Sequence, residues 1–139
     1  MNIDGVNNGY VIDHIKAGTG LEIYNFLKLD KADCTVAIIQ RASSTKYGRK
    51  DIIKIDGDID IDCDTLGYMD ENITVNRIRD RQLLEKIHLE LPETLNDVIK
   101  CRNPRCITSV EDIEHRFKLA DRERKKYRCL YCDTEYTGE

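Results

Sequence analysis

Four cysteines toward the end of the sequence have the spacing of a metal site. The chain has 139 residues and six cysteines, and four of these form two close pairs, Cys-x4-Cys and Cys-x2-Cys, separated by 22 residues. These four are Cys101, Cys106, Cys129 and Cys132. Each pair can supply two corners of a tetrahedron from one turn, and four thiolates favour Zn²⁺ in a closed site without a position for water. The spacing therefore predicts one structural zinc ion per chain and argues against a zinc enzyme.

Two other uses of these thiols stay open from the residues alone. Four thiolates can also hold a single iron ion, although such redox sites usually use two Cys-x2-Cys turns. Disulfides need an oxidising compartment, whereas the first residues, "MNIDGVNNGYVID", lack the basic and apolar regions of a signal peptide. We therefore expect a reducing, cytoplasmic location. Cys34 and Cys63 stand apart and are expected to be buried, unreactive thiols.

The composition predicts a soluble globular chain. Hydrophobic residues make up 40% and charged residues 35%, with no Trp, and no apolar run approaches the roughly 18 residues that a membrane span needs. Residues 1–100 carry a formal charge of −5 and residues 101–139 a charge of +1. This acidic balance argues against nucleic acid as a partner, because nucleic-acid binders usually present a basic face.

Basic residues nevertheless surround the cysteines in the sequence. They are Arg102, Arg105, Arg122, Arg124, Lys125, Lys126 and Arg128. They fit either a charged docking surface or simple compensation of the −2 charge that a zinc ion with four thiolates carries. They also keep open the alternative of a zinc-ribbon nucleic-acid-binding protein.

The first hundred residues alternate between strand-like and helix-like patterns. Strands are expected at 9–15, 34–42, 49–57, 71–78 and 83–91, and helices at 17–29 and 62–69. The order β-α-β-β-α-β with an extra strand indicates an α+β, ferredoxin-like fold with both helices on one face of an antiparallel sheet. Dimerisation through the other face or through a sheet edge would cover the surface that the helices leave open.

A domain boundary is expected in the region 92–100, where Pro92 follows an apolar stretch. We place the two domains at 1–95 and 96–139. The second is a small, β-rich unit with few large apolar side chains, so metal binding would supply part of its folding energy.

Several stretches together resemble one known family. In order, they are "GYVIDHI", "GRKDIIKI", "TVNRI", "LPETLNDVIKC", "CRNPRCI" and "CLYC". In this order and spacing they resemble the regulatory chain of aspartate carbamoyltransferase, an enzyme of pyrimidine synthesis. The resemblance implies a chain without catalytic activity, with an N-terminal allosteric domain and a C-terminal zinc domain. It also implies regulatory-chain dimers whose zinc domains dock on catalytic chains.

The resemblance also implies nucleotide effectors, with CTP as inhibitor, ATP as activator and UTP acting with CTP. The matching positions are Gly5, Val6, Asp13, His14, Lys54, Asn76, Ile78, Leu83 and Lys86. The two lysines would neutralise phosphate and ribose-proximal oxygens, Asp13 would accept from ribose hydroxyls, and backbone near Val6 and Ile78 would read the base. Without the resemblance, most of these positions would be read as solvated or core residues. The chain departs from the family pattern at Arg81, where a familiar member has an aromatic side chain at the edge of the pocket, and this departure implies a different base preference.

Overall fold

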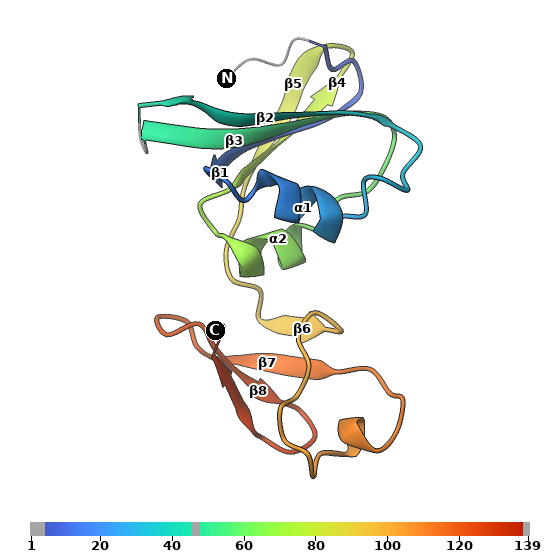
Figure 1. Ribbon diagram of the computed structural model, residues 1–139, viewed down its shortest axis with the longest axis vertical. Helices are drawn as coiled ribbons and strands as arrows, with labels where there is room; N and C mark the ends of the chain where they lie inside the picture. Colours follow the sequence, from blue (N-terminus) through green and yellow to red (C-terminus); the bar gives the residue numbers. More distant parts are fainter. Residues whose placement is uncertain (1–4, 46–47, 138–139) are drawn as a thin grey trace. The chain divides into compact units, whose positions relative to one another are not determined.

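Alternating apolar and polar residues over the first ninety positions form a five-stranded antiparallel sheet in the computed structural model, which describes residues 5–45 and 48–137. In chain order, the strands are β1 (Gly9–Lys16), β2 (Thr35–Ser44), β3 (Gly48–Asp56), β4 (Thr74–Arg79) and β5 (Gln82–His88). Their order in the sheet is β2-β3-β1-β4-β5 (Figure 1). Helix α1 (Gly20–Phe26) joins β1 to β2, and α2 (Cys63–Met69) joins β3 to β4. The predicted α+β class and element order are confirmed.

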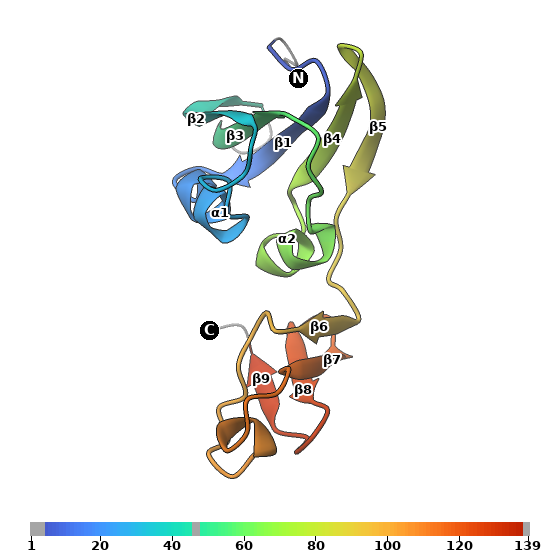
Figure 2. The ribbon, with the colours of Figure 1, turned by 90° about the vertical axis from the view of Figure 1, so that its right-hand side faces the viewer.

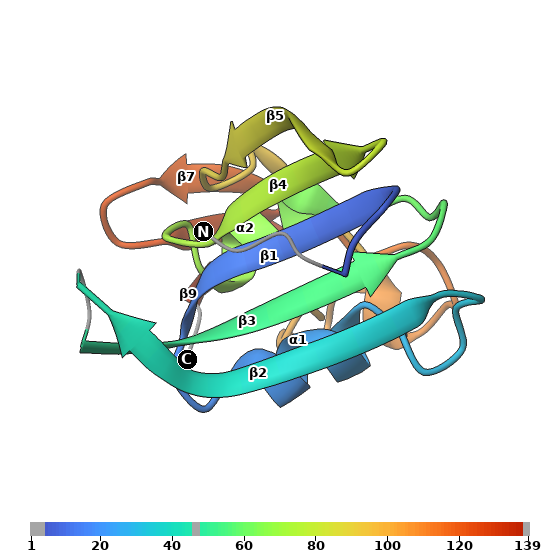
Figure 3. The same ribbon diagram turned by 90° about the horizontal axis from the view of Figure 1, so that it is seen from above.

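Both helices lie on the same face of this sheet (Figures 2 and 3). The core between helices and sheet is aliphatic, as the absence of Trp predicts. Its fully buried members are Ile12, Ile15, Ile23, Leu29, Ile53, Ile55, Leu66, Ile73 and Val75. In β1, β3 and β4 these residues alternate with side chains on the opposite face, which we call the helix-free face.

Helix α1 is shorter than the predicted 17–29 because the chain turns sharply on both sides of it. Gly18 has a φ of +94°, and the Thr19 side chain donates to the Lys16 carbonyl oxygen (2.7 Å) instead of capping the helix. Beyond the helix, Lys28 has a φ of +55°, outside the helical region. Periodicity alone cannot detect these turns.

Helix α2 begins where the sequence indicates. Asp62 accepts a hydrogen bond from the Thr65 N–H (3.1 Å) and is the N-cap. Gly67, which weakens the helix prediction, has a packing reason, because a Cβ there would collide with the carbonyl oxygen of Glu90.

Two β-bulges flank β3. The register shifts between Ile12 and Ile15 in β1 and between Ile39 and Ala42 in β2, where His14 and Arg41 have φ values of +59° and +58°. The fully buried Asp51 of β3 accepts hydrogen bonds from the N–H groups of Arg41 (2.9 Å), Gly18 (3.0 Å) and Gly20 (2.9 Å). This carboxylate therefore ties the β2 bulge to the turn that follows β1.

Residues 91–139 form a second compact unit. Its sheet has the order β6-β7-β8-β9, formed by β6 (Thr94–Asn96), β7 (Arg116–Asp121), β8 (Lys126–Cys129) and β9 (Glu135–Thr137). The boundary expected between residues 95 and 96 lies inside β6, which pairs with β7, so the division falls earlier, after Glu90. Phe117 and Tyr127 are the largest buried side chains, and the Tyr127 hydroxyl donates to the Pro92 carbonyl oxygen (2.6 Å). A core this small provides little stability by itself, so a bound metal would be a significant further source of stability.

Candidate functional site

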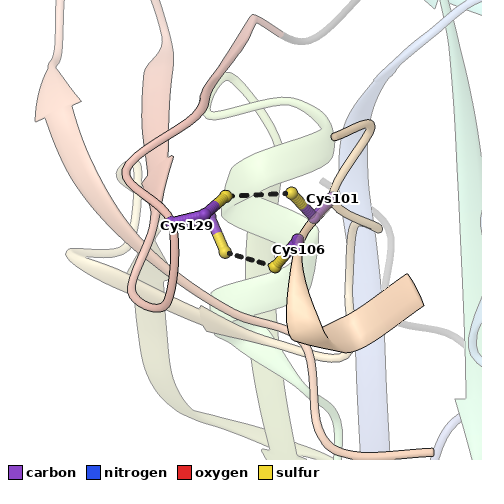
Figure 4. A group of neighbouring side chains, drawn as sticks. Cys101, Cys106 and Cys129 are labelled. Carbon is purple, nitrogen blue, oxygen red and sulfur yellow. Dashed lines mark hydrogen bonds between the residues drawn. The ribbon is translucent and has the colours of Figure 1, made fainter. Parts of the chain in front are cut away.

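The four cysteines of the predicted metal site meet at one end of the second unit. Cys101 lies in the loop after β6, and Cys106 precedes the short 3₁₀ helix η1 (Ile107–Ser109). Cys129 ends β8, and Cys132 lies in the turn that leads to β9. Figure 4 shows Cys101 and Cys106, from one loop, and Cys129, from the end of β8, directed toward one another.

The distances fit one tetrahedral ion. All four sulfur atoms lie within 4.8 Å of one another, with 3.6 Å between Cys101 and Cys132 and 3.7 Å between Cys106 and Cys129. Four sulfurs at tetrahedral corners, about 2.3 Å from a central Zn²⁺, are separated by about 3.8 Å. Among residues 5–45 and 48–137, no other group of three or more Cys, His, Asp or Glu residues is arranged to hold a metal ion. The cluster therefore has the geometry of a closed, structural metal site.

Backbone hydrogen bonds hold both cysteine turns in shape. The Cys106 N–H donates to the Asn103 carbonyl oxygen (3.0 Å). In the second turn, the Asp133 N–H donates to the Cys129 carbonyl oxygen (2.9 Å), and Asp133 has a φ of +61°. A hydrogen bond with Thr134 lowers the pKa of Cys132 to about 6, whereas burial raises the pKa of Cys101 to about 12. A cation at the centre would favour the ionised form of all four thiols.

The two remaining cysteines are less buried than expected. Cys34 and Cys63 are each partly exposed, and burial is the main cause that raises the pKa of both thiols above the usual value. A raised pKa makes a thiol less nucleophilic, so both positions agree with unreactive side chains.

The basic residues near the cluster are held by neighbours within the second unit. Lys126 and Arg128 form ion pairs with Glu135 at 3.2 and 3.1 Å, and these pairs lower the pKa of that carboxyl group. Arg122 donates to the Leu91 carbonyl oxygen (3.0 Å), and Arg102 lies over the Tyr136 ring at 4.2 Å. Much of the positive charge is therefore committed to contacts inside the unit.

Apolar side chains are exposed on the cysteine turns. Leu130 and Tyr131 lie between Cys129 and Cys132, while Ile107 and Val110 follow Cys106. All four are substantially exposed, and Val110 is 79% exposed. The cysteine cluster thus brings together two turns that both present apolar surface. We call these four residues the apolar turn surface.

Cross-strand register aligns the main predicted effector residues of the first unit. Val11 lies opposite Lys54 on one side and Asn76 on the other, and Asn76 lies opposite Lys86. Their sequence neighbours Ile12, Ile53, Val75 and Ile87 pack in the core beneath the helices. Because side chains alternate along a strand, Lys54, Val11, Asn76 and Lys86 form a row on the helix-free face.

Asn76 is the polar residue buried at the centre of this row. It is 1% exposed, and its Nδ2 donates to the Val11 carbonyl oxygen (3.1 Å). Its Oδ1 has no hydrogen-bond partner among the described residues. A buried carbonyl oxygen without a donor is costly, so the free acceptor of Asn76 makes it a candidate ligand-contacting residue.

Asp13 and His14 lie beside the row because of the β1 bulge. Asp13 is buried and forms an ion pair with Lys50 (3.0 Å), and it also accepts from the His14 N–H (2.6 Å). Burial by itself raises the pKa of Asp13, but the hydrogen bonds and positive charge of Lys50 and His14 outweigh it and hold the pKa below its usual value. The His14 Nδ1 lies 3.2 Å from the Thr74 hydroxyl oxygen, on the same side of β4 as Asn76. Without the bulge, Asp13 and His14 would point to opposite faces.

The other predicted effector residues lie at the opposite end of the same face. Val6 and Ile78 are buried and pack together with Val11 in a second apolar cluster. Gly5 has a φ of +89° and begins the segment that carries Val6. Leu83 lies opposite Ile78 on β5 and is exposed. All nine predicted residues thus belong to one face of the sheet or to the N-terminal segment that packs on it.

Sequence reasoning missed several residues that the structure places here. Lys50 pairs with Asp13, and Thr74 contacts His14. A cavity of about 500 Å³ beside His14 is also lined by Lys16 and Arg49. The alternation of positions 50, 52 and 54 along β3 was the available signal for Lys50, whereas the cavity depends on loop positions that sequence patterns do not give.

Two family models match this chain. Residues 1–90 match the allosteric domain of the aspartate carbamoyltransferase regulatory chain, and residues 93–139 match the metal binding domain of that chain. The chain belongs to the aspartate carbamoyltransferase regulatory chain family. The family resemblance predicted from the short sequence stretches is confirmed.

Individual relatives agree over nearly their whole length. The aspartate carbamoyltransferase regulatory chain of Clostridium acetobutylicum is 52% identical over 139 residues, covering 99% of this chain and 95% of the relative. That of Clostridium botulinum is 50% identical with the same coverage. The chain of Bifidobacterium longum is 46% identical over 136 residues, covering 97% of this chain and 98% of the relative.

Membership of this family decides several points. The chain is a regulatory, non-catalytic subunit, and a catalytic chain is the partner that such a subunit implies. The cysteine cluster lies wholly within the matched metal binding domain, and the helix-free face lies within the allosteric domain. The zinc-ribbon nucleic-acid-binding alternative is not favoured. No helix in residues 5–45 or 48–137 has the length and apolar character to cross a membrane.

Proposed function

We propose that this regulatory chain binds the nucleotides CTP, ATP and UTP on the helix-free face and thereby controls aspartate carbamoyltransferase in cytoplasmic pyrimidine biosynthesis. The single observation that carries the proposal is the buried Asn76 Oδ1, which has no donor among the described residues. A nucleobase amino group or a sugar hydroxyl is a donor of suitable chemistry.

Charge along the face supports a nucleoside triphosphate. Lys54 and Lys86 stand at the two ends of a row of four strands, a span of about 14 Å at about 4.8 Å per strand spacing. His14, Lys16 and Arg49 line the adjoining cavity together with the single carboxylate of Asp70. The polyphosphate would lie near Lys86 and His14, Asp13 would accept from ribose hydroxyls, and the base would lie toward Val6 and Ile78. Leu83 would border the base, and Gly5 would let the chain turn over it.

Calorimetry on the full regulatory chain tests the site. Lys86→Ala should weaken binding of CTP, ATP and UTP about 10- to 100-fold, because a hydrogen bond to a charged group contributes about 1.5–3 kcal/mol. Arg77→Ala is the matched control, since Arg77 is the neighbour of Asn76 on the face that the helices cover and forms an exposed ion pair with Glu85 (3.8 Å), which contributes little to stability. Equal affinities for Lys86→Ala and wild type would remove Lys86 from the site.

The proposed metal is one structural Zn²⁺ ion per chain, held by Cys101, Cys106, Cys129 and Cys132. The four-sulfur donor set and the sulfur–sulfur distances support zinc. Its function would be to fix the two cysteine turns, and with them the apolar turn surface. No coordination position is left for a reacting water.

The apolar turn surface is the proposed contact with the catalytic chain. Val110→Glu should weaken assembly with the catalytic chain, measured by size-exclusion chromatography of the mixed subunits, because a charge would be buried in an apolar contact. Leu21→Glu is the control, because Leu21 is an exposed leucine on α1 in the other unit. Assembly unchanged by Val110→Glu would place the contact elsewhere.

The regulatory effect is proposed to act through quaternary structure. Two allosteric domains would pair through their sheets, and three such dimers would bridge two catalytic trimers. A nucleotide can shift the balance between two quaternary states only through its different affinity for them, and such couplings amount to about 1–3 kcal/mol.

A further inference from the structure

The segment Gly5–Asn8 is fastened to the end of β3 by one carboxylate. The N–H groups of Asn7 and Asn8 both donate to Asp56 Oδ1 at 3.2 Å. The Gly57 N–H in turn donates to the Asn8 carbonyl oxygen (2.9 Å). These bonds fix one side of the segment at the edge of the helix-free face.

The other side of the segment is fastened to the β4–β5 hairpin. The Arg81 N–H donates to the Asn7 carbonyl oxygen (2.9 Å), and Arg81 Nε donates to Asn7 Oδ1 (2.6 Å). The Asp80 N–H donates to Asn8 Oδ1 (3.1 Å). We call the side-chain bond between Asn7 and Arg81 the Asn7–Arg81 clasp.

Arg81 occupies a backbone position that disfavours it. Asp80 and Arg81 form a two-residue hairpin loop between Arg79 and Gln82, with φ values of +52° and +63°. Loops of this type require positive φ at both positions and strongly favour Asp-Gly or Asn-Gly. Arginine is therefore not the residue that the hairpin backbone favours, which points to a task for its side chain.

The clasp lies at one end of the helix-free face. Val6, next to Asn7, is buried against Val11 and Ile78. Ile78 lies opposite Gly9, at the end of β1 remote from Asp13, which lies opposite Thr74. The ion pair of Asp13 and the ring of His14 thus stand at the far end of the face from the clasp. The clasp consequently borders the apolar end of the face.

We propose that Arg81 and Asn7 are a positioning pair for the nucleobase. Their clasp holds Gly5–Asn8, and hence Val6, over the apolar end of the face, so that affinity depends on the base as well as on the phosphates. This inference rests on the proposed nucleotide-binding function and adds Asn7, together with the contact through which Arg81 would act.

The variant Arg81→Gly removes the side-chain bond of the clasp without disturbing the hairpin backbone. Glycine suits the positive φ and restores the Asp-Gly sequence that such hairpins favour, while the main-chain bond from residue 81 to Asn7 is kept. Thermal unfolding of the full chain should therefore show an unchanged or higher midpoint. A purely structural role for Arg81 would instead make this variant less stable.

Calorimetry with two probes decides the inference. Arg81→Gly and Asn7→Ala should each weaken CTP binding about tenfold, the double variant should be no weaker than either single one, and inorganic tripolyphosphate should bind all forms equally. If Arg81→Gly leaves the CTP affinity unchanged, the proposed positioning role of the clasp is wrong. If CTP and tripolyphosphate lose the same affinity, the clasp does not act on the base. If wild type binds neither CTP nor tripolyphosphate, the proposed function fails and the clasp fails with it. If wild type binds both and Arg81→Gly leaves both unchanged, the clasp alone fails.

Discussion

Replacing Asn76 by Leu, a side chain of similar size, would remove a buried amide from the centre of the proposed nucleotide site on the helix-free face. The change deletes one hydrogen bond, from Nδ2 to the Val11 carbonyl oxygen, and also deletes an Oδ1 without a donor among the described residues. The lost bond costs about 1 kcal/mol, whereas removal of an unsatisfied buried acceptor gains about 1–3 kcal/mol. The free energy of unfolding should therefore rise by about 0–2 kcal/mol.

The same substitution should weaken nucleotide binding. An acceptor at the centre of the site is lost, so CTP affinity should fall about tenfold or more. For a unit of this size, a gain of 1 kcal/mol corresponds to a rise of about 4–8 °C in the unfolding midpoint. Opposite signs of the two effects would mark Asn76 as a residue kept for binding at the expense of stability.

Thermal unfolding followed by circular dichroism, together with calorimetry of CTP, measures both effects in the full chain. The exposed Asn25 of α1 provides the control, because Asn25→Leu should leave CTP affinity unchanged. A variant Asn76→Leu that loses more than about 1 kcal/mol of stability and keeps full CTP affinity would refute the reasoning, because the amide would then serve the fold alone.

Three further predictions follow from other parts of the chain. Cys129→Ser should lose bound metal and unfold the second unit, because structural zinc contributes about 10–16 kcal/mol of apparent binding energy, and Cys34→Ser should keep full metal content by atomic absorption. Lys50→Met should lower the free energy of unfolding at pH 7 by about 3–5 kcal/mol, because it removes the ion-pair partner of the buried Asp13 carboxylate. The pKa of Asp13 is lowered in the folded chain, so its stabilisation is present above the unfolded pKa and lost as pH falls through the folded value. Denaturant unfolding should accordingly show the deficit of Lys50→Met shrinking below about pH 4, and a deficit independent of pH would contradict this. Gly67→Ala should destabilise by about 1–3 kcal/mol although alanine favours helices, because its Cβ would collide with a main-chain carbonyl oxygen; a stabilised variant in the same assay would show that the backbone yields.

Local sequence patterns predicted most of the fold, but they misplaced the ends of helix α1 and the domain boundary. Short runs of β-branched and apolar residues marked all five strands of the first unit, because many of these residues pack in an aliphatic core. Helix α1 was predicted too long because Lys28 takes a positive φ that its residue type does not announce. The boundary was placed too late because β6 pairs with β7, a contact between distant segments.

The metal site was easier to predict than the proposed nucleotide site on the helix-free face. In each close cysteine pair, the short spacing alone places both thiols on one turn, so the sequence is enough to predict that they can bind one ion. The row from Lys54 to Lys86 instead depends on register across four strands, which loop lengths and bulges decide. The resemblance to a family supplied these residues. It did not supply Lys50 or the clasp partner Asn7, whose positions follow from the bulges and the hairpin loop.

The buried carboxylate of Asp51 makes separate parts of the first unit mechanically dependent on one another. Its two oxygens hold main-chain groups of the turn that follows β1 and of the bulge in the edge strand β2. A movement of either segment alone would strip a donor from a fully buried acceptor, at a cost of about 1–3 kcal/mol. The least costly displacement moves the turn and the edge strand together. Asp51 thereby couples the position of the edge strand to that of the turn that follows the strand carrying Asp13 and His14.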